Sequence, residues 1–388
     1  MTTSTALPEQ MTNGDPVAAA KTIAAQVLSA HAGRVDREAV FPAESIAAIH
    51  AAGLLGAAVA RRYGGAELSL NEQVGVAREL GRGCSATAMV WAMHQVQIAC
   101  VARHHGDDQD LVATLTRYVT TGTLIASITS EAGVGGSLRT STAAVELDGD
   151  RAVLSKKAPT VSYGAYAGAY LVTARRSADA EAGDQVAVLA DATCSELAPT
   201  GPGWNPMGMR GTCSPAFGFT TTVPASHILP VGFDTIAAAT MVPHSHILWA
   251  AVWIGIAADA FKRAQTAVRK RGTTDVRLAD AARALTQLEA LLADSVRRYT
   301  PIWDDPAALE TLGGPGLTMQ FNDLKVLVSR GAVDVVELAL EICGMAGYAE
   351  AGPLSVARHL RDLYSARLMI GNERLIATNT QLALLKRG

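Results

Sequence analysis

The sequence predicts an α+β protein in three parts: an N-terminal helical domain over residues 1–122, a central β-domain over 123–232 and a C-terminal helical bundle over 233–388. Three observations lead to this prediction. Apolar residues recur at three- and four-residue spacing in the first part, short β-branched runs follow, and the helical spacing then returns in longer segments. A chain of 388 residues, 49% of them hydrophobic, can bury cores of this size.

The N-terminal part is expected to contain several helices, since glycines at Gly53, Gly64-Gly65 and Gly81 to Gly83 interrupt the periodic pattern. Residues 1–15 carry neither a basic nor an apolar signal region and are expected to form a frayed tail. We therefore expect the protein to remain in the cytoplasm.

The central part contains short runs bounded by Gly and Asp. Ala144 to Asp148 is followed by the pair Gly149-Asp150 and then by Arg151 to Ser155. Two strands joined by two turn-forming residues are typical of a β-hairpin.

The C-terminal part contains long periodic segments that suit antiparallel helices packed along their length. These segments are Met241–Arg271, Val276–Ile302, Leu317–Gly344 and Val356–Lys386. The most apolar run, Ile247 to Ala258, has 12 residues, fewer than the roughly 18–20 that cross a bilayer. It is expected to be a buried helix, and no membrane partner is predicted.

Charge and cysteine content exclude several classes of function. The net charge is -3, and the longest basic run is Arg269 to Arg271, so nucleic acid is not an expected partner. The 5 cysteines lack CxxC or Cys/His spacing, which predicts neither disulfides nor a metal site and favours a reducing cytoplasm.

Four motifs occur in an order that resembles the acyl-CoA dehydrogenase superfamily of flavoproteins. They are Ile128–Gly136 (ITSEAGVGG), Ala158–Tyr163 (APTVSY), Gly208–Thr212 (GMRGT), and the series Glu341–Tyr348, Arg361-Asp362 and Gly371–Glu373. Each motif alone is weak, but their order and spacing support one another. The resemblance implies a helical domain, a β-domain, a four-helix bundle, and FAD, or alternatively FMN, as cofactor.

The resemblance also implies which residues contact the flavin. The hydroxyls of Thr129, Ser130 and Ser162 would face the isoalloxazine ring, and Gly135 and Gly136 would let the backbone approach a phosphate. Without the resemblance, these would be ordinary strand and turn residues. Further expected contacts are Ile128, Val161 and Asn372 and, across the interface of a homodimer or homotetramer, Arg271, Gly344, Met345 and Gly347.

This sequence departs from the family at the catalytic base. An acyl-CoA dehydrogenase needs a carboxylate to remove the substrate α-proton. The family's two positions for that glutamate correspond here to Ile370 and Ser245. Glu373 could replace it only if the local alignment shifts by three residues, almost one helical turn.

A branch of the superfamily, the two-component flavin monooxygenases, also lacks this glutamate and uses O2 with reduced flavin from a separate reductase. By this resemblance we expect a monooxygenase acting on an aromatic or amine-bearing small molecule. His94, on an apolar helix, and Ser162 are the candidate catalytic residues, although a lone His on an apolar face is more often a core residue. The candidate pocket residues are Tyr163, Trp204, Ile370 and Ser245.

Two other functions fit the same sequence. One is a dehydrogenase for an acyl-CoA or acyl-carrier-protein thioester that uses a non-standard base such as Glu373. The other is a non-catalytic subunit that contributes its fold to an active partner.

Overall fold

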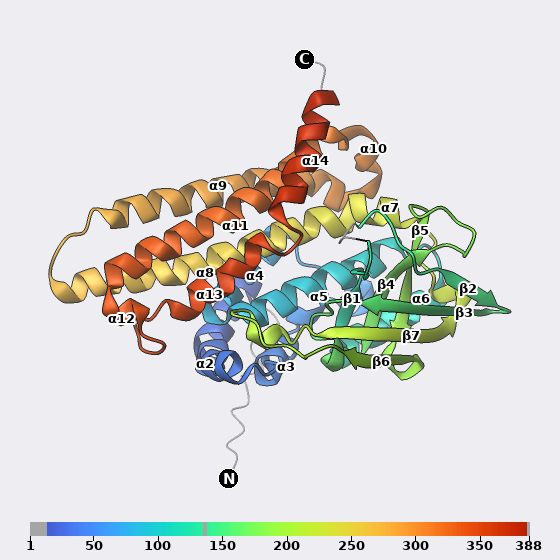
Figure 1. Cartoon of the computed structure of the whole chain (residues 1–388), viewed down its shortest axis with the longest axis horizontal. Helices are drawn as coiled ribbons and strands as arrows, with labels where there is room; N and C mark the ends of the chain where they lie inside the picture. The colour runs from blue at the N-terminus through green and yellow to red at the C-terminus, as the bar shows by residue number, and fades with distance from the viewer. Residues whose placement is uncertain (1–13, 135–137, 386–388) are drawn as a thin grey trace, which may run out of the picture.

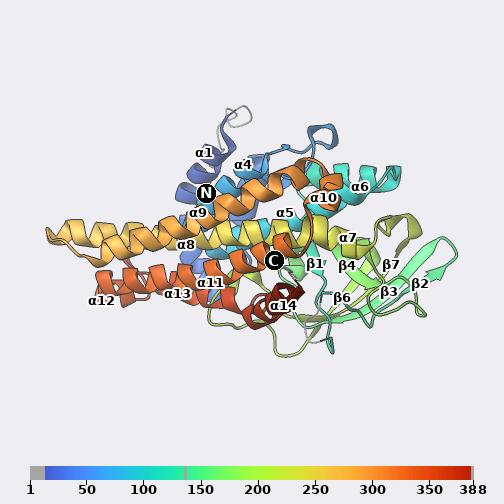
Figure 2. The same ribbon diagram turned by 90° about the horizontal axis from the view of Figure 1, so that it is seen from above.

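The computed structural model describes residues 14–134 and 138–385. Helices form the first and last parts of the described chain, and two small sheets lie between them in sequence (Figure 1). In both views the long helices extend to one side of the molecule and the strands lie at the other (Figure 2).

The N-terminal part is helical as far as Thr121. Ser69 and Glu72 form a capping box that starts the fourth helix, and Gly122, with a φ of 65°, ends the sixth in the left-handed region. The helices are α1 (Pro16–Ile23), α2 (Ser29–Glu38), α3 (Ala43–Ala51), α4 (Leu70–Gly83), α5 (Ser85–His104) and α6 (Gln109–Thr121).

The strands form two sheets with the orders β1-β4-β5 and β2-β3-β7-β6. Strand β1 runs parallel to β4, and all the other pairs are antiparallel. Asp148 pairs with Arg151 across the Gly149-Asp150 turn, which confirms the predicted hairpin. The strands are β1 (Ile125–Ile128), β2 (Val145–Asp148), β3 (Arg151–Ala158), β4 (Ala169–Arg175), β5 (Gln185–Asp191), β6 (Ser195–Thr200) and β7 (Ala216–Pro224).

The C-terminal part is helical from Phe233, and three of its long helices lie where the periodicity placed them. The helices are α7 (Phe233–Ile236), α8 (Val242–Arg271), α9 (Arg277–Asp304), α10 (Leu309–Leu312), α11 (Pro315–Cys343), α12 (Met345–Tyr348), α13 (Ala357–Tyr364) and α14 (Asn372–Leu385). The prediction of one helix over Val356–Lys386 is wrong. Residues 365–371 separate α13 from α14, and Ile370 has a left-handed φ of 46° that no helix can continue through.

Helix α8 is the central element of the core and packs against α4, α9 and α11. A Cβ atom on Gly255 would lie 2.2 Å from the Arg78 carbonyl oxygen of α4, so only glycine permits this approach. The predicted burial of Ile247–Ala258 is confirmed, apart from the partly exposed Trp249. The helical stretch Phe233–Arg271 could span a membrane by length and composition, but 89% of its apolar window is buried inside the protein.

Candidate active site

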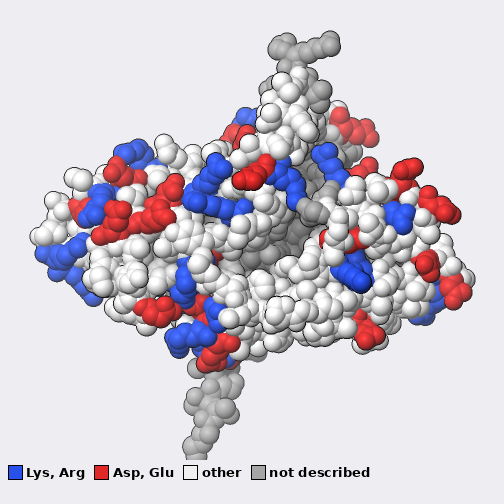
Figure 3. Space-filling model, viewed as in Figure 1, with Lys and Arg blue, Asp and Glu red and all other residues white. Residues whose placement is uncertain are grey.

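One face of the molecule is hollowed between the helical bundle and the sheets (Figure 3). In the same view, α14 lies above the hollow and strand β1 lies beside it (Figure 1). The chain leaving β1 meets the chain leaving β3 in this region, because the Ser130 hydroxyl donates a hydrogen bond of 2.8 Å to the Thr160 carbonyl. The structure therefore brings together the two segments that were predicted to contact the flavin.

Within these segments the backbone positions Ile128 and Val161 are buried, whereas the side chains of Thr129, Ser130 and Ser162 are partly exposed. The Ser130 hydroxyl gives its hydrogen to Thr160 but can still accept, and the hydroxyls of Thr129 and Ser162 can donate or accept, which suits the mixed donor and acceptor edge of an isoalloxazine ring. The donor set thus fits a flavin. Gly135 and Gly136, predicted to approach a phosphate, lie outside the described residues.

A buried ion pair holds the segment that follows β1. Lys156 Nζ lies 3.6 Å from Glu131 Oε2 and donates hydrogen bonds to the Thr173 carbonyl at 2.7 Å and to the Thr129 carbonyl at 3.4 Å. Burial lowers the pKa of Lys156 to about 8, against the opposing effect of Glu131. The pair fixes the backbone of Thr129, one of the candidate flavin contacts.

The Glu131 carboxylate has several further donors. It accepts hydrogen bonds from the Ser141 hydroxyl at 2.6 Å, from the Thr142 and Ala143 amides at 3.0 and 2.8 Å, and from the Thr142 hydroxyl. Burial would raise the pKa of Glu131, but these hydrogen bonds and the charge of Lys156 hold it below its usual value. Glu131 is therefore ionised and structural, and it is not a free base.

Ser162 is held by a chain of hydrogen bonds that reaches the C-terminal helices. Its hydroxyl accepts from Ser214 at 2.9 Å, the hydroxyl oxygens of Ser214 and Thr212 are 2.9 Å apart, and Thr212 donates to the Met209 carbonyl at 2.9 Å. The Met209 amide in turn donates to Asp362 of α13 at 2.6 Å. The Gly208–Thr212 turn therefore connects the candidate flavin segment to the helix that precedes Ile370.

Ile370 lies in the turn between α13 and α14, and its side chain is 36% exposed. The Ile370 carbonyl accepts a hydrogen bond of 3.0 Å from Lys325 Nζ, which also donates to Asn372 Oδ1 at 2.7 Å. Lys325 is fully buried, has no carboxylate within 4 Å among the described residues, and has its pKa lowered by burial to about 7. This lysine fixes the turn at the first position where the family carries its base.

Asn372 was predicted to contact the cofactor. Its side chain is buried, accepts the bond from Lys325 and donates to Ser329 Oγ at 3.0 Å. The amide is thus engaged inside the bundle, and the structure gives Asn372 a role in holding the turn.

Neither of the other two candidate base positions presents a carboxylate to the interior. Ser245, on α8, is buried and its hydroxyl donates to the Val242 carbonyl of the same helix at 2.9 Å. Glu373 lies in the first turn of α14 and is exposed to solvent.

His94 is buried on α5, with both ring nitrogens bonded to backbone groups. The Ile125 amide donates to Nδ1 at 3.1 Å, so Nε2 must carry the proton that points to the Leu55 carbonyl at 3.2 Å. Burial lowers the pKa of His94 to about 4. The ring joins α5 to β1 and to the Leu54–Gly56 turn, and this geometry argues against the predicted proton transfer.

The two aromatic pocket candidates differ in burial. Tyr163 is fully buried, and its hydroxyl donates to the Ile125 carbonyl at 2.9 Å. It is therefore a core residue rather than the pocket-wall residue predicted from the sequence. Trp204 is partly exposed and donates from Nε1 to the Arg210 carbonyl at 3.1 Å, which places it on the Gly208–Thr212 turn.

The residues predicted to reach a partner's flavin lie together at one end of the bundle. Arg271 Nη2 donates to the Ile342 carbonyl at 2.8 Å, next to the turn formed by Gly344, Met345 and Gly347. In both views α12, which contains Met345 and Gly347, lies far from β1 (Figures 1 and 2). Within one chain the two sets of candidate contacts cannot meet the same flavin.

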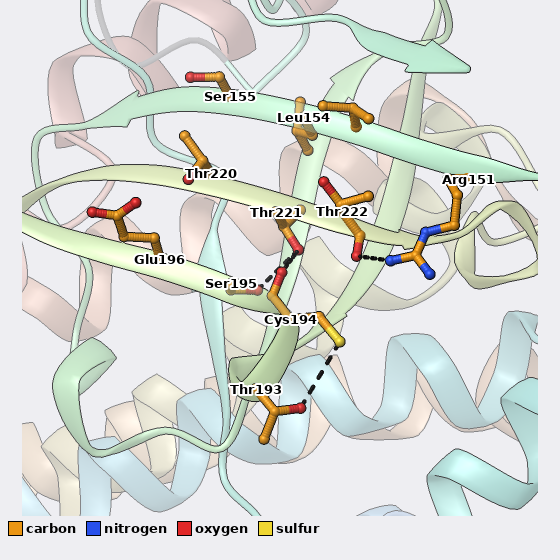
Figure 4. A pocket seen from close by; sticks show the side chains of 11 residues that line it. Arg151, Leu154, Ser155, Thr193, Cys194, Ser195, Glu196, Thr220, Thr221 and Thr222 are labelled. Carbon is orange, nitrogen blue, oxygen red and sulfur yellow. Dashed lines mark hydrogen bonds between the residues drawn. The ribbon is translucent and has the colours of Figure 1, made fainter. Parts of the chain in front are cut away.

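A separate shallow groove of about 510 Å³ lies on the outer face of the four-stranded sheet (Figure 4). Its lining includes Arg151, Cys194, Glu196 and Thr222, and none of the predicted site residues. Arg151 donates to the Thr222 carbonyl at 2.8 Å and is thus engaged. The groove is not part of the candidate site, and no cluster of metal ligands occurs among the described residues.

Lys156 and Lys325, the two buried lysines that fix the site backbone, are not among the site residues predicted from the sequence. Lys325 leaves a local signal, because a lysine within the apolar run LKVLV of a long helix is unusual. Its partners lie 45 and 47 residues away along the chain, and no local pattern specifies them.

Comparison with known proteins gives matches in the same order. Residues 16–121 match the family model described as acyl-CoA dehydrogenase, N-terminal domain, and residues 232–381 match its C-terminal domain. The amino sugar nitrososynthase DnmZ of Streptomyces peucetius is 28% identical over 355 residues, which cover 86% of this chain and 84% of DnmZ.

Two solved structures show the same fold. FMN-bound TdsC from Paenibacillus sp. A11-2 has a TM-score of 0.84 at 19% identity and covers 96% of this chain and 98% of its own. Butyryl-CoA dehydrogenase from Megasphaera elsdenii has a TM-score of 0.80 at 19% identity, with 98% and 99% covered. The fold expected from the sequence is confirmed.

Proposed function

Because this chain belongs to the acyl-CoA dehydrogenase superfamily and is a flavin-dependent oxidoreductase, we propose that it is a monooxygenase that uses reduced flavin and O2. The proposed substrate is an aromatic or amine-bearing small molecule. The relatives include both the nitrososynthase DnmZ and TdsC, a dibenzothiophene monooxygenase, and they also include a dehydrogenase.

One observation carries the choice between these reactions. At Ile370 the chain presents an aliphatic side chain, and at Ser245 a hydroxyl that is bonded within its own helix. Neither can remove an α-proton from a thioester, whereas oxygenation requires no such carboxylate.

The flavin, FAD or FMN, would be held by the segments after β1 and β3. Thr129, Ser130 and Ser162 would supply hydrogen bonds to the ring, and Arg271 with the Gly344–Gly347 turn would reach the flavin of a neighbouring chain. A bound reduced flavin supplies the electrons that activate O2.

The chain's own residues hold this site in place. The Glu131–Lys156 pair fixes the backbone of Thr129, and the chain from Ser214 to Asp362 fixes Ser162. Lys325 holds the Ile370 turn, which puts an apolar side chain where the dehydrogenases carry a carboxylate.

The decisive experiment supplies the purified protein with a flavin reductase, NADH and free flavin and records oxygen-dependent product from a panel of aromatic and amine substrates. We expect product only when reductase and O2 are both present. Bleaching of the bound flavin by an acyl-CoA under anaerobic conditions would contradict the proposal.

The second candidate is a thioester dehydrogenase, which the similarity to butyryl-CoA dehydrogenase favours. Glu373 would then be the base. Replacing Glu373 with Gln should abolish acyl-CoA oxidation while flavin binding is retained, and an unchanged rate would remove this candidate.

We further propose a homodimer or homotetramer, a separate flavin reductase as partner, and a cytoplasmic location. Support for the oligomer comes from large apolar side chains exposed on or beside α11, α12 and α14. They are Leu327, Met345, Leu368, Ile376 and Leu384. Size-exclusion chromatography with light scattering tests the oligomer, and a monomeric mass would contradict it.

A further inference from the structure

Three polar aromatic residues, His246, Trp249 and Trp253, form a stripe along α8. They are three and four residues apart, which places them on one side of the helix. Their ring centroids are 6.0 Å apart between His246 and Trp249 and 6.4 Å apart between Trp249 and Trp253. We call these three residues the α8 stripe.

Each residue of the α8 stripe carries a buried polar atom without a hydrogen-bond partner among the described residues. These atoms are His246 Nε2, Trp249 Nε1 and Trp253 Nε1. His246 is only 1% exposed. Single unpaired buried polar atoms also occur elsewhere among the described residues, but three on adjoining rings of one helix face point to a ligand.

The free nitrogen of His246 has a defined character. Nδ1 lies 3.0 Å from the Phe321 carbonyl of α11, which can only accept, so Nδ1 carries the hydrogen and Nε2 is an acceptor. Burial lowers the pKa of His246 to about 4, the charge of Lys325 lowers it further, and the Phe321 bond opposes both. The ring is therefore neutral at pH 7 and accepts a hydrogen bond without taking the proton.

The α8 stripe is linked to the candidate active site through α11. Between Pro243 and Ala258, Trp249 is the one residue of α8 that is partly exposed. Phe321, which binds His246, lies one helical turn before Lys325, and Lys325 binds the Ile370 carbonyl. The stripe is thus connected to the turn at which the family's base is replaced.

We propose that the α8 stripe is the substrate-recognition wall, with His246 Nε2 accepting a hydrogen bond from a neutral N–H or O–H group of a ring-shaped substrate. This inference rests on the proposed function and adds a substrate class to it. The partly exposed indole ring of Trp249 offers flat apolar surface for stacking. The charge of Lys325 disfavours an ammonium group, and the lone pair of Nε2 disfavours an anion.

Binding of two matched probes tests the proposal. Indole presents one N–H donor on a flat ring, and 1-methylindole replaces that hydrogen with a methyl group. We expect the flavin-loaded wild-type protein to bind indole about five- to tenfold more tightly in calorimetric titration, which corresponds to one neutral hydrogen bond. His246→Leu should bring the two affinities to within about twofold of each other.

His244→Leu is the control, because His244 is equally buried on α8 and its Nδ1 also lacks a partner among the described residues, but its ring lies off the stripe, bonded to Gln73 of α4 at 2.9 Å and 4.5 Å from the Trp303 ring centroid. It should keep the preference for indole even if the protein is less stable. Equal binding of the two probes by the wild-type protein would overturn the proposal without any variant, as would a preference that survives in His246→Leu. If the protein prefers indole to 1-methylindole as expected but oxygenates no substrate, the result would count against the proposed monooxygenase reaction and not against the α8 stripe.

Discussion

The buried pair of Glu131 and Lys156 gives the sharpest test of how the flavin segment is held. Their side chains are 4% and 1% exposed, and the Lys156 ammonium is bonded to the Thr129 backbone. Replacing Glu131 with Gln removes the charge but keeps the size of the side chain. Lys156 would then be a buried cation without a carboxylate partner.

The structure predicts that the two single variants differ in cost. Glu131→Gln should lower the free energy of unfolding by about 3–5 kcal/mol, the usual cost of breaking a buried ion pair from one side. Lys156→Met should cost less, about 1–3 kcal/mol, because Glu131 would keep its hydrogen bonds from Ser141, Thr142 and Ala143. The double variant should cost at least about 1 kcal/mol less than the sum.

Urea unfolding followed by circular dichroism measures these differences, and flavin titration followed by fluorescence measures the effect on the Thr129 segment. Asp184→Asn is the control, since Asp184 pairs with Arg176 at 3.1 Å on the surface and should cost no more than about 1 kcal/mol. A Glu131→Gln protein as stable as the control, or strictly additive costs, would refute this reasoning. Unchanged flavin affinity in Glu131→Gln would show that the ion pair does not influence cofactor binding.

The other predictions concern histidines and the subunit interface. His94→Leu should lower the free energy of unfolding by about 1–3 kcal/mol, since two buried backbone groups lose their hydrogen-bond partner. A variant with normal stability but no turnover would instead support a catalytic His94. His94 and His246 stay neutral to about pH 4 in the folded protein, whereas an unfolded histidine gains a proton near pH 6.5. The free energy of unfolding should therefore fall as the pH drops from about 6.5 to about 4, by up to about 1.4 kcal/mol per pH unit for each histidine. A flat urea midpoint between these pH values would contradict this. If Arg271 reaches the flavin bound by a neighbouring chain, Arg271→Met should weaken flavin binding in the oligomer. Equal flavin affinities of the oligomeric wild-type and variant proteins would argue against a shared site.

Sequence patterns predicted features that depend on neighbours within a few residues. The periodicity of α8, α9 and α11 and the Gly149-Asp150 hairpin are local, and their positions are confirmed. The predicted fourth long helix is wrong because Ile370 adopts a left-handed φ, and only the contact from Lys325 on another helix shows why the chain turns there.

Site residues were harder to interpret because their chemistry depends on distant partners. His94 looked like a candidate acid or base in an apolar helix, but both of its ring nitrogens are taken by backbone groups 31 and 39 residues away. Tyr163 is likewise engaged with Ile125, 38 residues away. The residue type alone could not show which polar atoms are free.

The sequence by itself therefore determined the order of the three parts, the motifs shared with the superfamily, and the absence of a glutamate at positions 370 and 245. Only the tertiary structure decided which polar atoms are satisfied and which remain open, because burial and long-range hydrogen bonds set both the pKa and the availability of a side chain. It assigned His94 to the core and left Nε2 of His246 without a partner.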